Sequence, residues 1–90
     1  MRSAVVVVAE ENGLHARPAA EFVAAVRAHA AAVTLRNATT GAGPEEGASI
    51  IGLLRLGMLR GHRIVVEVEG GDEEAALADL AGRLGTVVER

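Results

Sequence analysis

The spacing of the hydrophobic residues changes several times along this chain, and these changes constrain its fold more than any single residue does. Ser3–Ala9 is a short β-branched run that ends at the polar turn Glu10–Gly13, which predicts a buried strand. From Ala16 onward the apolar residues recur with the period of an amphipathic helix: Ala19, Phe22, Val23, Val26 and Ala30. The predicted fold therefore opens with a strand and a helix.

Two later segments alternate between apolar and polar residues, as strands with one buried face do. They are Ala32–Asn37 and His62–Gly70, the second with the alternation of Ile64, Val66 and Val68. Between them, Thr39–Ala48 is rich in glycine and is typical of a loop, in which a short edge strand can lie.

Two further helices are predicted from their end signals. Ser49 is a suitable N-cap and Gly57 a suitable stop for a helix of about two turns. Asp72 can cap the last helix, whose apolar stripe runs on to Val88. The order β-α-β-(β)-α-β-α predicts an α+β open-faced sandwich with three or four strands, and the 90 residues are expected to form one domain, residues 1–90.

Composition excludes several classes of function. The net charge of −3 and the single aromatic residue argue against a nucleic-acid partner. No stretch approaches the roughly 20 apolar residues of a membrane span, so we expect no membrane insertion. Glu10 and Glu11 follow the first apolar run where a signal peptide would be cleaved, so we expect a cytoplasmic protein. Neither cysteine nor histidine occurs at metal-ligand spacing, so no metal site is predicted.

His15 stands out because of its neighbours. Gly13 permits a tight turn and the helical pattern starts directly after His15, so the imidazole lies at the N-terminus of a helix. Pro18 falls in the first turn, where its missing N–H costs nothing, and Arg17 can bind phosphate oxygens. From the residues alone, His15 is either a phosphoryl-accepting nucleophile or a histidine that starts a helix by chance.

Three segments resemble one known family. NGLHARPAAEFV (residues 12–23) is similar to the active-site signature of HPr, the histidine-containing phosphocarrier family of the phosphoenolpyruvate-dependent sugar phosphotransferase system. ASIIGLLRLGMLRG (48–61) resembles the serine and short helix of that family, and GGDEEAALADL (70–80) resembles the start of its final helix. The resemblance covers nearly the whole chain.

This resemblance implies a four-stranded antiparallel sheet with three helices on one face, in the order β-α-β-β-α-β-α. It implies a phosphoryl carrier rather than an enzyme, without a cofactor and expected as a monomer. His15 would be phosphorylated on Nδ1 by enzyme I, which is charged from phosphoenolpyruvate, and would pass the group to the IIA domain of a sugar permease. Arg17 would stabilise the transferring phosphoryl group, with backbone N–H groups of Ala16 and Arg17 beside it.

The resemblance also implies an apolar surface for both protein partners. If Leu53 and Leu56 face the core, a helix of two turns must leave its other apolar side chains exposed. The expected partner-binding residues are Ala20, Ile50, Ile51 and Leu54, with Phe22 as a further candidate.

Ser49 matches a serine that a dedicated kinase phosphorylates in many Gram-positive members of the family. A serine kinase is therefore a candidate partner, although an N-cap role alone also explains this serine. Ala48 stands where the family often has a basic residue, and the loop before it is longer than usual. Both departures lie beside Ser49 and leave the His15 segment unchanged.

Two histidines and two other functions complete the expectations. His29, near the end of the first helix, and His62, before a strand, are expected to have only surface roles. A regulatory protein with the same fold would signal through its phosphorylation state. A small ligand-binding or nucleic-acid-binding module would not be phosphorylated at all.

Overall fold

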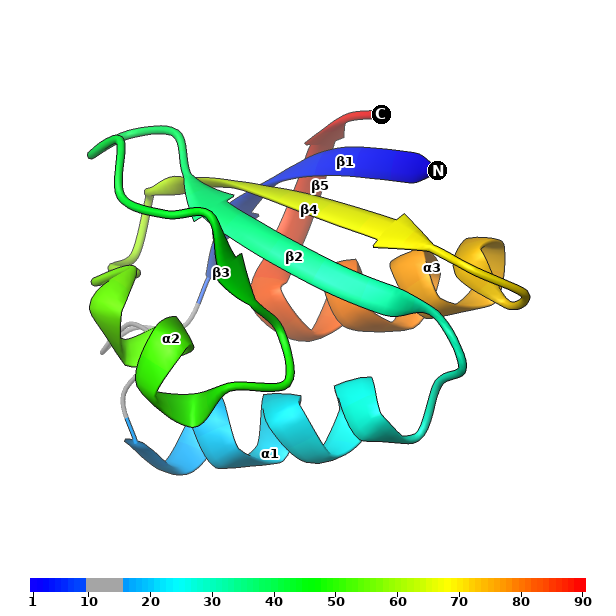
Figure 1. Cartoon of the computed structure of the whole chain (residues 1–90). Coiled ribbons are helices and arrows are strands. Elements are labelled where there is room, and N and C mark those ends of the chain that lie inside the picture. Colours follow the sequence, from blue (N-terminus) through cyan, green and yellow to red (C-terminus); the bar gives the residue numbers. More distant parts are fainter. Residues whose placement is uncertain (10–15) are drawn as a thin grey trace.

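A computed structural model describes residues 1–9 and 16–90, although not the side chains of residues 16 and 17. Its helices and strands follow one another in the order that the sequence predicts, except that one more strand follows the last helix (Figure 1). They are β1 (Arg2–Val8), α1 (Ala16–Arg27), β2 (Ala32–Asn37), β3 (Glu45–Glu46), α2 (Ile50–Arg55), β4 (Arg63–Glu69), α3 (Glu73–Leu84) and β5 (Gly85–Glu89).

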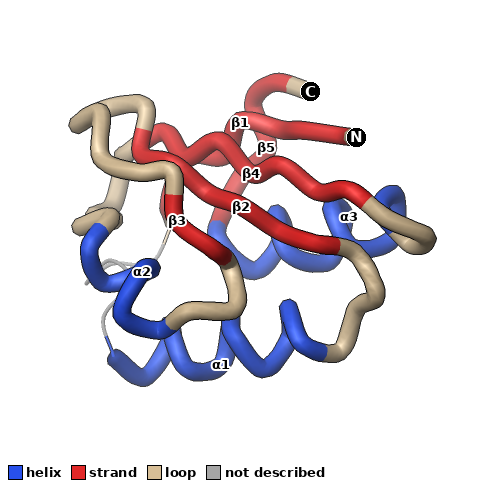
Figure 2. The backbone as a smooth tube through the Cα atoms, in the orientation of Figure 1, coloured by secondary structure: helices blue, strands red, loops and turns tan. Residues whose placement is uncertain are grey.

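The strands form one antiparallel sheet in the order β3-β2-β4-β1-β5. All three helices lie on the same side of this sheet, so the molecule has two layers and the other side of the sheet is open (Figures 1 and 2). This confirms the predicted α+β open-faced architecture. The short edge strand expected within the loop is β3, and it is only two residues long.

The prediction of four strands is wrong, because a fifth strand follows the last helix. The apolar stripe predicts a helix that continues to Val88, whereas α3 ends before Gly85 and the chain turns back along β1. A Cβ on Gly85 would collide with the carbonyl oxygen of Val7, so a glycine lets the two strands approach. The residues after Gly85 are β-branched, and Val87 packs against the core.

The core lies between the sheet and the helices, and it is almost wholly aliphatic. Alternate residues of each central strand point into it, and their neighbours point to the open face. Phe22 is only 3% exposed and belongs to this core, so it is not available to a partner protein. The largest fully buried apolar side chains are Leu35, Leu53, Leu56, Met58, Ile64 and Leu80.

The expectation for His29 needs correction, since its side chain is only 17% exposed and joins the segment after α1 to α3. Its Nδ1 lies 2.9 Å from Asp72 Oδ2 and its Nε2 lies 2.8 Å from Asp79 Oδ2. Carboxylates accept hydrogen bonds and do not donate them, so both ring nitrogens carry a proton and the ring is an imidazolium. Hydrogen bonds to Asp79 and Asp72 raise the pKa of His29 accordingly.

Asp72 occupies the predicted N-cap position of α3, but its side chain makes no capping hydrogen bond to that helix. The carboxylate instead accepts hydrogen bonds from the backbone N–H of Ala30 and Ala31, as well as from His29. The hydrogen bond from His29 is the main cause that lowers the pKa of Asp72. Asp72 therefore ties the start of α3 to the segment between α1 and β2.

Candidate functional site

The helix α1 begins at Ala16, directly after the position of His15, as the sequence predicts. His15 itself lies outside the described residues, and so do the side chains of Ala16 and Arg17. The first N–H groups of any helix have no acceptor within the helix, and its dipole is positive at that end. No acidic residue stands in the first turn of α1, so no carboxylate of that turn opposes an anion there.

Ser49 caps α2 as predicted, since its Oγ accepts a hydrogen bond of 3.0 Å from the Gly52 N–H. Gly57 has a φ of +57°, in the left-handed region that favours glycine, and follows the end of this helix. The hydroxyl of Ser49 therefore already has a structural task. A serine in this role stabilises its helix by about 1 kcal/mol relative to alanine.

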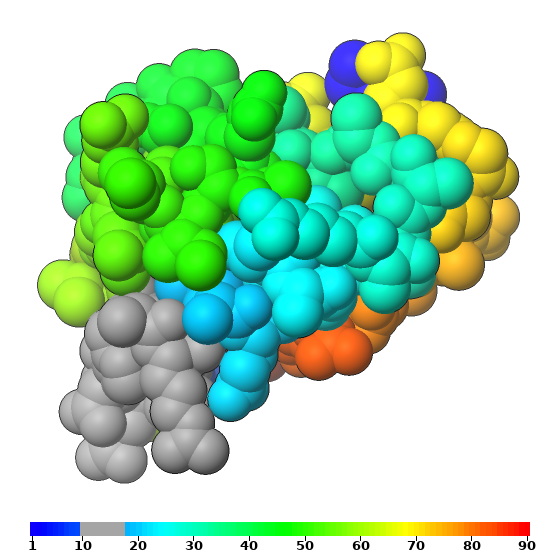
Figure 3. Space-filling view, turned by 60° about the horizontal axis from the view of Figure 1, so that its bottom comes forward, coloured from blue at the N-terminus to red at the C-terminus, as the bar shows by residue number. Residues whose placement is uncertain are grey.

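The short helix α2 divides its apolar side chains between the core and the surface. Leu53 and Leu56 are buried, at 0 and 1% exposure. The condition under which an exposed apolar surface was expected, that both leucines face the core, is therefore met. The opposite side of the helix carries an exposed apolar patch, the α2 patch, formed by Ile50, Ile51 and Leu54, which are 41, 65 and 42% exposed. Ala20 is exposed on α1, and α1 and α2 contact each other on the helical side of the molecule (Figure 3).

Two side chains from other elements fix the position of α2, and sequence reasoning missed both. Arg27, at the end of α1, donates from Nη2 to the Ala48 carbonyl oxygen at 3.4 Å. Asn37, at the end of β2 and 1% exposed, donates from Nδ2 to the Leu56 carbonyl oxygen at 3.0 Å. A polar residue at the core-facing end of an apolar strand was the signal that could have identified Asn37.

His62 supports Asn37, which corrects the expectation of a surface role. Its Nδ1 lies 3.0 Å from Asn37 Nδ2 and accepts a hydrogen bond of 3.2 Å from the Leu59 N–H. Because both partners donate, Nδ1 carries no proton. Asn37 also accepts hydrogen bonds at Oδ1 from the N–H groups of Thr39 and Thr40. These five residues form one polar network beneath the loop that leads to α2.

A carboxylate lies close to the first turn of α2. A Cβ added to Gly52 would lie 3.1 Å from Glu45 Oε1 and 3.2 Å from the Cβ of Ser49. Glu45 comes from β3, within the glycine-rich segment Thr39–Ala48. Ser49 is therefore an N-cap serine with a negative charge as its neighbour.

No metal site is found in the described part of the chain. Residues 1–9 and 16–90 contain no group of three or more histidine, aspartate or glutamate side chains placed to hold a metal ion. His29, Asp72 and Asp79 come together, but they bind one another. In the same residues no helix is long and apolar enough to cross a membrane.

Known proteins resemble this chain both in sequence and in fold. The family model "PTS HPr component phosphorylation site" matches residues 2–84. A Phosphocarrier protein HPr of Haemophilus influenzae is 31% identical over 87 residues, which cover 97% of this chain and 99% of the relative. That of Streptomyces coelicolor is 41% identical over 70 residues, which cover 78% of this chain and 73% of the relative.

The chain also matches one part of larger proteins. It is 36% identical over 75 residues to the Multiphosphoryl transfer protein of Escherichia coli O157:H7, and these residues cover 83% of this chain but 20% of that protein. Among solved structures, a Phosphocarrier protein HPr from Bacillus anthracis superposes with a TM-score of 0.85 at 34% identity, covering 92% of this chain and 95% of the other. On the family model, the full-length relatives and the fold, the chain belongs to the PTS HPr family of phosphocarrier proteins.

Proposed function

We propose that this protein carries phosphoryl groups in a phosphoenolpyruvate-dependent sugar phosphotransferase system and that His15 is the acceptor. Enzyme I would transfer a phosphoryl group to Nδ1 of His15, and the carrier would then deliver it to a IIA domain of a sugar permease. The protein has no catalytic turnover of its own in this scheme. Since phosphoenolpyruvate is a metabolite of the cytoplasm, we place the protein in that compartment.

The observation that carries this proposal is the start of α1 at Ala16, directly after His15 and with no acidic residue in its first turn. A phosphoryl group on His15 would bring negative charge to the positive end of this helix. Free N–H groups of Ala16 and Arg17 would donate to its oxygens, and the Arg17 guanidinium would add a charged donor. Pro18, in the same turn, has no N–H to leave unpaired.

We further propose that Ala20 and the α2 patch form the docking surface for enzyme I and the IIA domain. The patch is apolar and exposed, and its helix is fixed by Arg27 and Asn37. An apolar surface that is already rigid loses little conformational entropy when a partner binds. One docking surface would serve both partners in turn, as a carrier requires.

Phosphorylation of Ser49 is the regulatory mode that we propose for this carrier. A phosphate on Ser49 would put charge next to Ile50 and Ile51, so binding to enzyme I would weaken. The carboxylate of Glu45 would repel that phosphate. A serine kinase would therefore modify Glu45→Gln faster than the wild-type protein, and equal rates would contradict a role for this carboxylate.

Phosphorylation with purified enzyme I tests the main proposal. With phosphoenolpyruvate, intact-protein mass spectrometry should show one added phosphate that is lost in acid, and fragmentation should place it on His15. His15→Ala should show none, whereas the matched control His29→Gln should be labelled like wild type. Normal labelling of His15→Ala would refute the assignment. Delivery to a sugar-specific IIA domain then separates sugar uptake from a purely regulatory phosphotransfer branch.

A further inference from the structure

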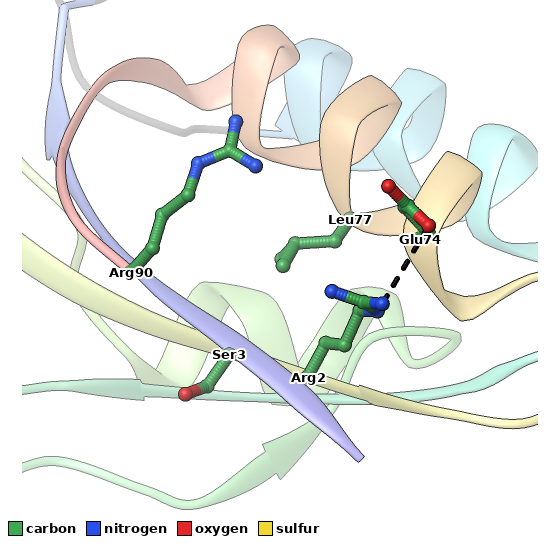
Figure 4. A pocket seen from close by; sticks show the side chains of 5 residues that line it. All are labelled: Arg2, Ser3, Glu74, Leu77 and Arg90. Atoms are coloured by element: carbon green, nitrogen blue, oxygen red, sulfur yellow. Dashed lines mark ion pairs between the residues drawn. The ribbon is translucent and has the colours of Figure 1, made fainter.

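The open face of the sheet has an apolar centre that no described element covers. Each central strand points alternate residues away from the helices, and those nearest the middle are valines. Val5, Val7 and Val65 are half-buried there. No helix lies on that side of the sheet (Figure 1). Figure 4 shows the same alternation at the start of β1, where Ser3 projects to the side away from α3. An antiparallel sheet can leave one face to water, but such faces are usually polar.

A single cross-strand row through this centre carries opposite charges at its two ends. The strand register pairs Arg36 with Val65, Val65 with Val5, and Val5 with Glu89. Residues directly opposite in adjacent antiparallel strands point to the same face, so the row runs from a cation through two valines to an anion. Arg36 and Glu89 are both exposed, and neither forms an ion pair with the described residues.

The acidic end of the row comes from the extra strand. Glu89 belongs to β5, which lies beyond the residues 2–84 that the family model matches. The bulge between Val5 and Val6 in the pairing with β5 sets which residue of β5 faces Val5. The opposed charges therefore depend on a residue that lies beyond the family match.

We propose that the open face binds a second copy of this chain in a symmetric dimer. A two-fold axis parallel to the strands and between β4 and β1 reverses the order of the strands in the second copy. Arg36 then lies over Glu89 of the second copy, and Val65 lies over its Val5. The row is thus complementary to itself, with one apolar centre and two ion pairs related by symmetry.

The neighbouring row suits the same arrangement. It pairs Thr34 with Glu67 and Glu67 with Ser3, so the axis brings each Glu67 over a serine hydroxyl that can donate a hydrogen bond. Sheets pack face to face about 10 Å apart with their strands roughly −30° from parallel, which long arginine and glutamate side chains can span. The three helices lie on the other side of each sheet, so the α2 patch stays free in the dimer (Figure 2).

Sedimentation velocity on the whole chain tests this proposal. We expect the weight-average mass to rise from monomer to dimer between about 10 µM and about 1 mM protein, the range in which small transient interfaces form. Val65→Lys should remove dimerisation, with circular dichroism confirming that the fold is kept. A monomer at every concentration would overturn the proposal, because the face would then be free for another kind of partner or for none.

Charge exchange tests the stated geometry. Arg36→Glu and Glu89→Arg should each weaken dimerisation by about tenfold or more, because each places like charges opposite one another twice. The double variant Arg36→Glu/Glu89→Arg should restore it to within about threefold of wild type. Arg55→Glu, a matched charge reversal at an exposed position on the helical side, should leave dimerisation unchanged. This arrangement would be overturned if the single variants dimerise as strongly as the wild type, or if the double variant does not regain dimerisation.

Discussion

Asn37 Nδ2 lies 3.0 Å from the carbonyl oxygen of Leu56, so a buried side chain at the end of β2 holds the residue that follows α2. The same amide lies 3.0 Å from Nδ1 of His62. The exposed α2 patch therefore rests on a helix whose C-terminal end is fixed to the sheet by a polar network. A docking surface held in this way keeps one shape before and after a partner binds.

Removing the Asn37 amide should loosen this helix and cost stability. Asn37→Ala leaves the Leu56 carbonyl without its donor, and an unpaired buried polar group costs about 1–3 kcal/mol. We expect urea denaturation to show a loss of this size. Thr40→Ala, which removes an exposed hydroxyl in the same loop, should stay within about 0.5 kcal/mol of wild type. If both variants lose the same free energy of unfolding, the hydrogen bonds of Asn37 do not stabilise the protein more than an exposed hydroxyl does.

Ser49 should contribute to stability through its cap, whether or not it is ever phosphorylated. Ser49→Ala removes the acceptor of the Gly52 N–H and should lower the free energy of unfolding by about 1 kcal/mol. Ser49→Asn also replaces the hydroxyl but retains a side-chain oxygen that caps helices well. Chemical denaturation should therefore find Asn close to wild type and Ala below it. The capping role fails if the two variants lose the same amount.

The elements of this fold were predictable where a local pattern decided the structure. The period of three to four residues from Ala19 to Ala30 indicated α1, and the cap signal of Ser49 with the stop signal of Gly57 indicated α2. The last strand was not predictable in this way. The residues after Gly85 continue a helical stripe and are equally good strand formers. These residues form a strand because they pair with β1, and this long-range pairing cannot be predicted from the local pattern.

In the candidate site, too, the features set by neighbouring residues were predictable and those set by long-range contacts were not. Exposure of Ile51 and the cap at Ser49 follow from a few neighbouring residues. The role of His29 depends on Asp72 and Asp79, which lie 43 and 50 positions further along the chain. Asp72 offered a clear local signal for a helix cap, but its carboxylate binds across the fold instead. Long-range hydrogen bonds of this kind override local preferences and have no signature in a single sequence.

The α2 patch should be needed for phosphoryl transfer but not for folding. Ile51 is 65% exposed, so Ile51→Glu should change the free energy of unfolding by no more than about 0.5 kcal/mol. A charge in an apolar contact weakens binding, and we expect the KM of enzyme I for this carrier to rise about tenfold. Ala78→Glu places the same charge on an exposed position of α3 and should leave transfer unchanged. If both variants transfer at the wild-type rate, the patch is not the docking surface.

The pH dependence of stability should report the contact of His29 with the two aspartates. The pKa of His29 is raised above its usual value of 6.5, first by the hydrogen bond to Asp79 and then by that to Asp72. Its contribution is therefore complete below pH 6.5 and is lost as the pH rises through the higher pKa of the folded state. The pKa values of Asp72 and Asp79 are lowered from 3.8, mainly by His29, so their contributions are lost as the pH falls below that value. The free energy of unfolding should thus fall both as the pH rises above 6.5 and as it drops below 3.8.

The alkaline side gives the clearer measurement, because the sequence contains no lysine, cysteine or tyrosine. Side chains of these three kinds ordinarily titrate above about pH 8 and would otherwise mask the change at His29. We expect the free energy of unfolding of the wild type to fall as the pH rises above 6.5, and this fall should be smaller in His29→Gln, whose side chain stays neutral. Titration of the His29 ring by NMR should give a midpoint above 6.5 in the folded protein. A midpoint at or below 6.5, with parallel stability curves for the two proteins, would mean that the imidazolium is not held between Asp72 and Asp79 in solution, since a ring with only one proton cannot donate to both carboxylates.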